Sequence, residues 1–331
     1  KVINMNRYGY ACINMQLSYP QKHGGQERGV LPITTGRSMI KRTFEAKGVD
    51  YASELTLNNV KDLDRIIDWN IHNGYNFFRI TSGLAPWKSE YKWDDLPDID
   101  EIRTWLYSAG VKAETHNVRI TSHPGPFNVL TSPHEHVVKN CVGDLTDHGD
   151  VFDMMNLSRT PYNKINIHIG GAYGDKESAM KRFCENFELL PDSVKSRLTV
   201  ENDDRASMYS VKDLYEGVYK KIGIPIVFDY HHHQFCTGDL SEKEALEMAI
   251  STWPKDIVPV VHYSESRRDE QLDESIRVQA HSDYIYNEID TYGHDIDIMV
   301  EAKRKELAVQ KYKELHMTDH YSSLPSVKAY I

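Results

Sequence analysis

Cysteine is scarce in this sequence of 331 residues, which has only four. No two of them form a C-x-x-C pair, and the gaps between them are long. This spacing indicates neither a disulfide framework nor a zinc knuckle. We therefore expect the four side chains to be buried, reduced thiols of an intracellular protein: Cys12, Cys141, Cys184 and Cys236.

The sequence also has fewer positively than negatively charged residues, and it lacks long apolar runs. The 39 Lys and Arg residues face 49 Asp and Glu residues, which gives a formal net charge of −10. Bulk attraction to nucleic acid or to an anionic membrane is therefore excluded, although a local basic stripe is not. No stretch approaches the roughly 20 apolar residues of a membrane helix, so we expect no membrane partner. The first ten residues also lack the apolar core of a signal peptide.

The sequence lacks the signatures of several common enzyme classes. No G-x-G-x-x-G motif follows the first predicted strand, and there is no Walker loop, nucleophile elbow or Ser-His-Asp order. Histidine, by contrast, is abundant, with 16 residues. With 27% charged and 10% aromatic residues, the composition is that of a globular protein with a sizeable core.

Helical and strand-like patterns alternate along the chain. Apolar residues at three- to four-residue spacing predict helices at 58–72, 99–108, 133–140, 177–190 and 298–315, and two more that begin at Ser210 and Ser241. Ser210 with Asp213, and Ser241 with Glu244, match the capping box. Short β-type runs lie at 9–14, 76–81, 118–122, 165–169, 198–201, 225–229, 259–263 and 296–301.

Eight apolar strands, most of them followed by a helix, indicate a parallel sheet covered on its outer face. In a chain of this length they predict a (β/α)8 TIM barrel of the α/β class. A doubly wound open sheet is the alternative. We predict a single catalytic domain over residues 1–315, with a polar, basic loop insertion at 21–54 and a C-terminal tail at 316–331.

Six predicted strands carry a histidine or a carboxylate at or near their carboxyl ends. These residues are His123, His168, Glu201, Asp229 with the following His231, His232 and His233, His262, and Glu301. In a barrel these strand ends converge on one face, where active sites lie. Taken singly, each residue has an ordinary explanation, as a structural histidine or as a cap for the next helix. Together they would repel or desolvate one another unless cations neutralised them.

Mixed histidine and carboxylate ligands suit Zn²⁺, Mn²⁺ or Fe²⁺ better than Ca²⁺ or Mg²⁺. There are more such residues than one metal ion uses, which favours a multinuclear site of the kind that clamps a phosphoryl centre. The residues alone therefore predict a metal-dependent hydrolase or isomerase.

Two weaker signals in the sequence have no settled interpretation. The GGAYG run at 170–174 could offer backbone N–H groups to phosphate or be an ordinary turn, and we expect His134 and His136 to be surface residues.

Eight motifs occur in an order that resembles the UV damage endonucleases, barrel enzymes related to apurinic endonucleases of the endonuclease IV type. They are RYGYACIN, FFRITSGLAPW, SHPGP, IHIGGAYGDK, VENDDR, FDYHHH, VVHYSES and VEAKRKE, and the resemblance spans residues 7–315. It implies a DNA repair endonuclease, a phosphodiesterase that nicks double-stranded DNA 5′ to cyclobutane dimers, 6-4 photoproducts or abasic sites. The implied products have 3′-hydroxyl and 5′-phosphate ends. The implied enzyme is a monomer, cytoplasmic in a prokaryote or nuclear in a eukaryote.

The resemblance also implies two or three divalent metal ions, with Mn²⁺ favoured and Zn²⁺ or Mg²⁺ as alternatives. The implied ligands are His123, His168 and Glu201 for the first metal, Glu201, Asp229, His262 and Glu301 for the second, and His232 and His281 for the third. Glu201, His232 and Glu301 are the implied catalytic residues. Some relatives have a histidine where Gly83 stands and a lysine where Val260 stands, so the chain departs from the family at two positions.

Further residues are implied to contact DNA. Tyr10, Asn14, Pro126 and Phe127 match positions that contact or probe the lesion, although a core tyrosine and an amide that satisfies a turn are the ordinary alternatives for the first two. Phe127 could wedge into the base stack, whereas Pro126 cannot donate the hydrogen bonds of the glutamine found there in relatives. The basic residues beside the ligand motifs are candidates for phosphate contacts: Arg79, Arg205, Arg267, Arg268, Lys303 and Lys305.

Two other functions remain open from the sequence. One is a sugar isomerase or epimerase on the same barrel, which would need one or two metals and a small polyol pocket. The other is a binder of damaged DNA that no longer cleaves it. The surplus of candidate ligands and the aromatic Phe127 favour the nuclease.

Overall fold

The computed structural model describes residues 6–20 and 30–317. Eight parallel strands close into a barrel in the order β1 to β8, and β8 pairs with β1. The strands are β1 Tyr8–Ala11, β2 Phe77–Ile80, β3 Arg119–Ser122, β4 Ile165–Ile167, β5 Leu198–Glu201, β6 Ile226–Asp229, β7 Val260–Tyr263 and β8 Asp297–Val300. The TIM barrel predicted from the alternating patterns is therefore confirmed, and the predicted strand ends differ from the observed ones by three residues at most.

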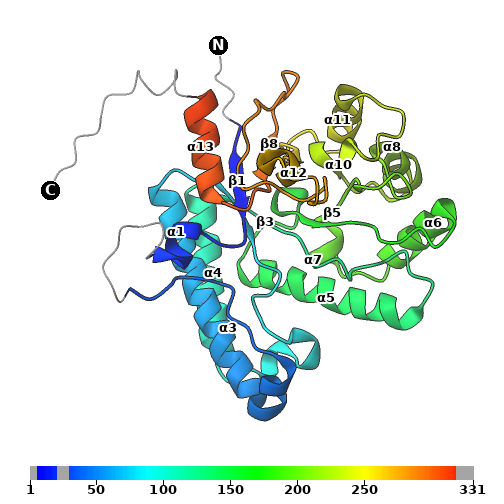
Figure 1. Cartoon of the computed structure of the whole chain (residues 1–331). Helices are drawn as coiled ribbons and strands as arrows, with labels where there is room; N and C mark the ends of the chain where they lie inside the picture. The colour runs from blue at the N-terminus through cyan, green and yellow to red at the C-terminus, as the bar shows by residue number, and fades with distance from the viewer. Residues whose placement is uncertain (1–5, 21–29, 318–331) are drawn as a thin grey trace.

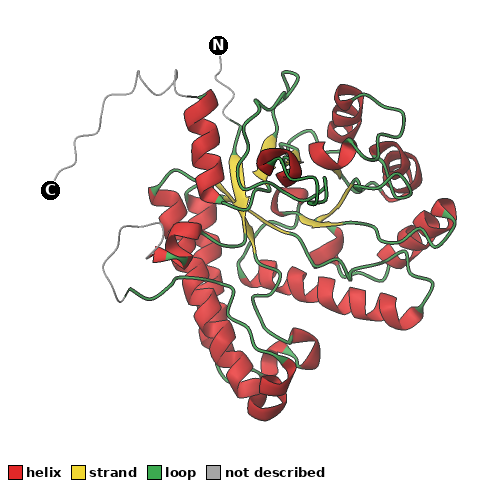
Figure 2. Cartoon of the chain, viewed as in Figure 1, coloured by secondary structure: helices red, strands yellow, loops and turns green. Residues whose placement is uncertain are grey.

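Helices surround the strands, as Figure 2 shows. The longer ones are α3 Lys41–His72, α4 Ile99–Thr115, α5 Glu135–Met154, α6 Lys176–Phe187, α11 Glu242–Ser251 and α13 Glu306–His316. Shorter ones are α1 Met15–Ser18, α7 Asp192–Lys195, α8 Val211–Leu214, α9 Lys220–Ile222, α10 Tyr230–His233 and α12 Arg267–Gln271; a π-helical turn, Tyr215–Tyr219, joins α8 to α9. Both predicted capping boxes, at Ser210 and Ser241, are present. Within the described residues, no helix is long and apolar enough to cross a bilayer.

Helix α3 corrects the prediction of a loop insertion at residues 21–54. Residues 21–29 lie outside the described residues, but the chain is helical from Lys41, with a kink at Gly48 where φ is +64°. The first turns are mostly exposed, so they lack the apolar stripe from which a helix is predicted. Phe44 holds them in place by stacking on Trp87, with 5.7 Å between ring centroids. In Figure 1, α3 lies along α4 at the left of the barrel.

The predicted helix at 298–315 begins eight residues late, at Glu306, because residues 297–300 form β8. It runs to His316, the first residue of the predicted tail, and residues 318–331 lie outside the described part.

The four cysteines are free thiols; Cys141 and Cys236 are buried, and Cys12 and Cys184 are partly exposed.

A buried ion pair closes the amino end of the barrel. Arg119, the first residue of β3, is fully buried, and its Nη1 lies 2.9 Å from Oδ2 of Asp297, the first residue of β8. Arg7 pairs with the same carboxylate oxygen at 3.0 Å. Most strand residues are buried, and the histidines and carboxylates predicted as metal ligands lie at the opposite, carboxyl end of the barrel.

A candidate metal centre at the carboxyl ends of the strands

The candidate ligands predicted from the sequence converge on the carboxyl ends of the strands. Glu201 and Asp229 are the last residues of β5 and β6, and His262 lies in β7. His123, His168 and Glu301 each directly follow a strand, and His232 belongs to α10. Asp229 and His262 are direct neighbours in the β6–β7 ladder. The barrel therefore gathers residues that lie far apart in the sequence.

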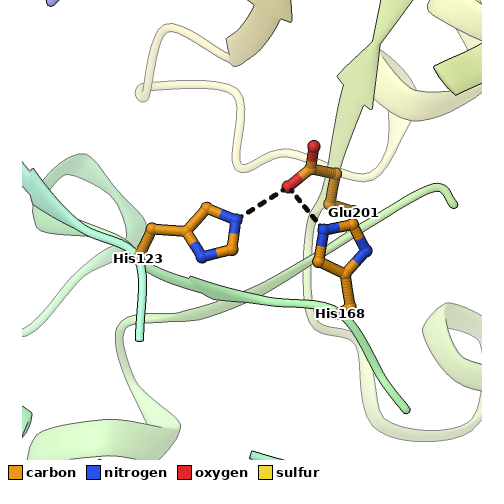
Figure 3. Close-up of side chains that lie close together, drawn as sticks. All are labelled: His123, His168 and Glu201. Atoms are coloured by element: carbon orange, nitrogen blue, oxygen red, sulfur yellow. Dashed lines mark hydrogen bonds and ion pairs between the residues drawn. The ribbon is translucent and has the colours of Figure 1, made fainter. Parts of the chain in front are cut away.

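Glu201 lies at the centre of this cluster and is only 1% exposed. Its Oε2 lies 3.1 Å from His123 Nε2 and 3.5 Å from His168 Nε2, as Figure 3 shows. Its Oε1 lies 3.1 Å from His262 Nδ1 and 3.4 Å from His232 Nδ1. The Glu201 carboxylate thus lies beside four imidazole rings, with two rings near each of its oxygen atoms.

Two sets of three residues have the spacing of a metal site. In each set the potential ligand atoms lie within 4.8 Å of one another: His123, His168 and Glu201 form one set, and Glu201, Asp229 and His262 form the other. Glu201 belongs to both sets. A shared carboxylate between two mixed histidine and carboxylate sets is a donor arrangement that suits a pair of divalent ions.

Asp229 has a carboxylate oxygen that no described protein group satisfies. Its Oδ2 is buried and has no hydrogen-bond partner among the described residues; His232 Nδ1 lies 3.7 Å away. Burial raises the pKa of Asp229 well above its usual range, and Glu201 and Glu301 raise it further against the opposing effect of His232. A buried carboxylate beside two others is costly unless a cation balances it. The donor set therefore fits a metal ion.

Partners outside the cluster hold the imidazole rings in position. His168 Nδ1 lies 2.8 Å from Asp203 Oδ1, and His232 Nδ1 lies 2.8 Å from the carbonyl oxygen of Asn202. His123 Nδ1 lies 3.1 Å from the carbonyl oxygen of Pro124. Metal-binding histidines commonly use one ring nitrogen in this way and offer the other to the metal.

The three central imidazoles differ in their affinity for protons. Burial lowers the pKa of His262 to about 4, so near neutral pH its ring is uncharged and donates a hydrogen bond to Glu201. Burial also disfavours the charged form of His168, but Glu201 and Asp203 outweigh it and raise the pKa to about 10. For His232, Asp229 and Glu201 similarly outweigh burial and raise the pKa to about 9. In the metal-free protein near neutral pH, His168 and His232 are therefore positively charged and His262 is neutral.

The residues predicted for a third metal, His232 and His281, belong to neither set of three close ligand atoms among the described residues. Glu301, predicted for the second metal, also lies outside both sets, and its Oε2 lies 4.0 Å from His281 Nδ1. Glu301 is instead paired with Arg79, whose side chain is largely buried. The Arg79 side chain is 14% exposed and its Nη1 pairs with Glu301, so a phosphate contact by Arg79 stays a prediction.

Lys164 is a site residue that was not predicted from the sequence. It directly precedes β4, is fully buried, and its Nζ lies 3.4 Å from His262 Nε2. Burial, together with Arg79, lowers its pKa to about 7. Val260, where relatives have lysine, is fully buried among apolar side chains. The signal in the sequence was a lysine immediately before an apolar strand, which could not reveal its neighbour 98 residues away.

Two predicted lesion contacts lie in the core. Tyr10 and Asn14 are both fully buried. The Tyr10 hydroxyl accepts a hydrogen bond from Asn14 Nδ2 at 3.1 Å and donates one to Asn70, while Asn14 Oδ1 accepts from the Leu17 N–H and caps α1. The alternative interpretation, a core tyrosine and an amide that satisfies a turn, is therefore correct, and the predicted DNA contact is wrong in this structure.

The other candidate contacts are accessible to different degrees. Phe127 is 77% exposed, and Pro126 beside it is exposed as well. Arg205 and Lys303 are exposed, whereas Arg267, Arg268 and Lys305 are partly buried. Gly83 lies on the surface, and His134 and His136 are exposed as predicted.

Comparison with known proteins reveals a consistent set of relatives. The family model described as "UV-endonuclease UvdE" matches residues 6–329. A UV-damage endonuclease of Schizosaccharomyces pombe is 34% identical over 312 residues, which cover 92% of this chain and 49% of that protein. A UV DNA damage endonuclease of Bacillus mycoides is 33% identical, with 90% of each chain covered. The chain therefore spans about half the length of the yeast relative and most of the bacterial one.

Solved structures agree with these sequence matches. The crystal structure of SacUVDE superposes with a TM-score of 0.78 at 29% identity and covers 97% of this chain and 100% of that one. Endonuclease IV from Thermus thermophilus superposes with a TM-score of 0.53 at 14% identity, over 77% of this chain and 94% of that one. The second likeness indicates a shared fold and nothing more.

Proposed function

Because the chain belongs to the UV-endonuclease UvdE family, we propose that it is a metal-dependent DNA repair endonuclease acting on UV-damaged DNA. The proposed reaction is hydrolysis of the phosphodiester 5′ to a cyclobutane dimer or a 6-4 photoproduct, and also at abasic sites, leaving 3′-hydroxyl and 5′-phosphate ends. The names of the relatives from Bacillus mycoides and Schizosaccharomyces pombe support the substrate class. The observation that carries the proposal is Glu201, which two potential ligand sets share.

The proposed metal ligands are those that the barrel gathers around Glu201. His123, His168 and Glu201 would hold one divalent ion, and Glu201, Asp229 and His262 the second, with Glu301 beside it. His232 and His281 remain candidates for a third ion; His281 Nδ1 lies 4.0 Å from Glu301 Oε2. When bound, such ions would stabilise the charge that develops on the phosphate oxygens. We favour Mn²⁺ for this mixed donor set, with Zn²⁺ or Mg²⁺ as alternatives.

The side chains of the candidate site differ in how deeply they are buried. Glu201, Asp229 and His262 are almost completely buried and form the floor of the site. His232 and Glu301 retain 12% and 10% of their side-chain surface and form the rim of the site. We propose Glu201, His232 and Glu301 as the catalytic residues, and Asp203 as the group that orients His168.

The substrate is proposed to be held by loops around this rim. Phe127, exposed on the loop after β3, would insert at the lesion, because apolar side chains act as wedges in kinked DNA. Pro126 would line the same contact. Arg205, Arg267, Lys303 and Lys305 are the proposed phosphate contacts. A monomer that acts on double-stranded DNA is sufficient for this arrangement.

A nicking assay tests the proposal directly. An end-labelled duplex with one cyclobutane dimer is incubated with chelated protein, to which Mn²⁺, Mg²⁺ or Zn²⁺ is added back. A metal-dependent cut immediately 5′ to the dimer supports the proposed reaction. A retarded complex without cleavage by any metal would instead indicate a binder of damaged DNA, and turnover of a ketose without DNA would indicate an isomerase or epimerase.

A further inference from the structure

Two loops at the carboxyl end of the barrel each carry an exposed aromatic ring that packs over a glycine of the same loop. On the loop after β3, Phe127 folds over Gly125, so that a Cβ on that glycine would lie 2.5 Å from the ring. On the loop after β4, Tyr173 folds over Gly171, where a Cβ would lie 3.1 Å from the ring. Each aromatic residue follows its glycine by two positions. The predicted role of the first ring raises the question of what the second one does.

Tyr173 is exposed although its backbone conformation is unfavourable. Its side chain is 49% exposed, and its φ is +49°, a left-handed value that is uncommon for a bulky residue. Such conformations persist where surrounding contacts impose them, and they are frequent at functional sites.

Arg182 of α6 supplies one of these contacts and links the two loops. Its guanidinium carbon lies 5.6 Å from the centroid of the Tyr173 ring, and its Nε donates to the carbonyl oxygen of Thr131 at 2.8 Å, on the loop that bears Phe127. Gly170, with φ +112°, lets its backbone lie against the side chain of Val129, since a Cβ there would lie 2.2 Å from Val129 Cγ1. The loops therefore form one packed unit.

The loop of Tyr173 is also joined to the candidate metal centre. The carbonyl oxygen of Gly171 accepts from the Tyr209 hydroxyl at 3.1 Å, and the Tyr209 N–H donates to Asp203 Oδ2 at 3.2 Å. The other oxygen of Asp203 lies 2.8 Å from His168 Nδ1. The carboxylate that orients a proposed metal ligand thus also helps to place the ring.

We propose that Tyr173 is a second stacking residue for damaged DNA, which receives a base unpaired at the lesion. This inference rests on the proposed function. Lesions weaken pairing and stacking, so bases at the damage are extruded at lower cost than bases of intact duplex. An aromatic face fixed by Arg182 on one side accepts any base, because every base has a π-face. Arg182 is then a positioning residue for Tyr173.

The test measures binding in the presence of a chelator, so that no cleavage occurs. Labelled duplexes with and without one cyclobutane dimer are titrated with wild-type protein, Tyr173→Asn and Tyr173→Phe, and anisotropy is recorded. Asparagine tolerates the left-handed conformation, so its effect reports loss of the ring rather than a strained loop. Tyr107→Ala removes a tyrosine that is 55% exposed on α4 and serves as the matched control.

We expect Tyr173→Asn to weaken binding of the lesion duplex by roughly tenfold, with a much smaller change for intact duplex. Tyr173→Phe and Tyr107→Ala should bind like wild type. If wild-type protein prefers the lesion duplex and Tyr173→Asn retains that preference in full, the stacking role is overturned while the proposed function stands. If wild type neither prefers nor nicks the lesion duplex, the proposed function fails and the inference fails with it.

Discussion

Among single residues, Glu201 is the one on which the candidate centre depends most, because both potential ligand sets include it. Glutamine keeps its size but removes the charge that would balance two cations. We expect Glu201→Gln to lower the nicking rate on the order of a thousand-fold, since metal ions contribute several kcal/mol to such transition states. The control is Glu216→Gln, an exposed carboxylate whose ion pair is with Lys220. Circular dichroism should show the same fold for both variants; undiminished nicking by Glu201→Gln would contradict the site.

Single residues also mark the limit of what the sequence can predict. His168 and Glu201 were predictable, because each stands at the end of an apolar strand whose direction fixes where it points. The pairing of Arg79 with Glu301 was not, because it joins residues 222 positions apart. Tyr10 and Asn14 were misjudged since their motif carries no sign of the buried Asn70 that pairs with Tyr10. Burial and pairing are set by the closed barrel and not by local pattern.

At the scale of elements, the loop after β3 is predicted to read the lesion through Phe127. Its ring is 77% exposed, and Asn128 anchors the loop by donating to Asp144 Oδ2 at 2.7 Å. Phe127→Ala should reduce the preference for a dimer-containing duplex over intact duplex more than it slows cleavage at an abasic site, where no stacked base remains to be displaced. Competition nicking assays measure both ratios. Leu189→Ala, a 60% exposed residue on a connection that leads into β5, is the control; equal losses on both substrates would count against a wedge.

Helix packing offers a second prediction at this scale, concerning stability rather than activity. Gly110 of α4 faces the end of α5, and a Cβ there would lie 1.7 Å from the carbonyl oxygen of Met155. Gly110→Ala should therefore destabilise the protein by about 1–3 kcal/mol or more, because the backbone cannot move aside. Gly143 of α5 has no atom within 4 Å of its Cβ position, so Gly143→Ala should stabilise by about 0.5–1 kcal/mol through helix propensity. Urea unfolding measures both; the same sign for both variants would refute this account.

The elements themselves were mostly predictable, because their signals are local. Each strand is a short apolar run, and the boxes at Ser210 and Ser241 mark where helices begin. The start of α3 was not predictable, since residues 41–47 have no apolar stripe and their helix depends on Phe44 stacking against Trp87, far along the chain. Tertiary contact replaces local propensity there.

For the whole molecule, the two ends of the barrel use charge in opposite ways. At the amino end the carboxylate of Asp297 pairs with both Arg119 and Arg7. At the carboxyl end the carboxylates of Glu201, Asp229 and Glu301 crowd together, and Asp229 Oδ2 is left without a hydrogen-bond partner in the described structure. One end therefore stabilises the fold by itself, and the other is arranged for a cation. We therefore predict that the stability of the folded protein depends on both metal binding and pH.

The metal-free protein should lose stability as the pH rises. His168 and His232 have folded pKa values of about 10 and about 9, above the usual value of 6.5. A group with a raised pKa stabilises fully below its unfolded value, and the contribution is lost as the pH passes through the folded value. The raised pKa of Asp229 acts in the same direction at lower pH, whereas Glu201 and Glu301, with lowered pKa values, contribute constantly above pH 4.5.

Metal binding should remove this dependence, because the ligands must give up their protons to bind. With a chelator present, we expect the thermal midpoint to fall between pH 6.5 and about pH 9. In this window the raised pKa values of the two histidines outweigh the lowered pKa of Lys164, whose effect on stability has the opposite sign above pH 7. With saturating Mn²⁺ the midpoint should be higher and change much less over that range, and calorimetric titration at pH 7 in buffers of different ionisation enthalpy should reveal released protons. His168→Gln should reduce both the proton release and the metal affinity, whereas exposed His134→Gln should change neither. A metal-free midpoint that rose with pH, or binding without proton release, would show that the cluster around Glu201 does not hold its protons as its geometry indicates.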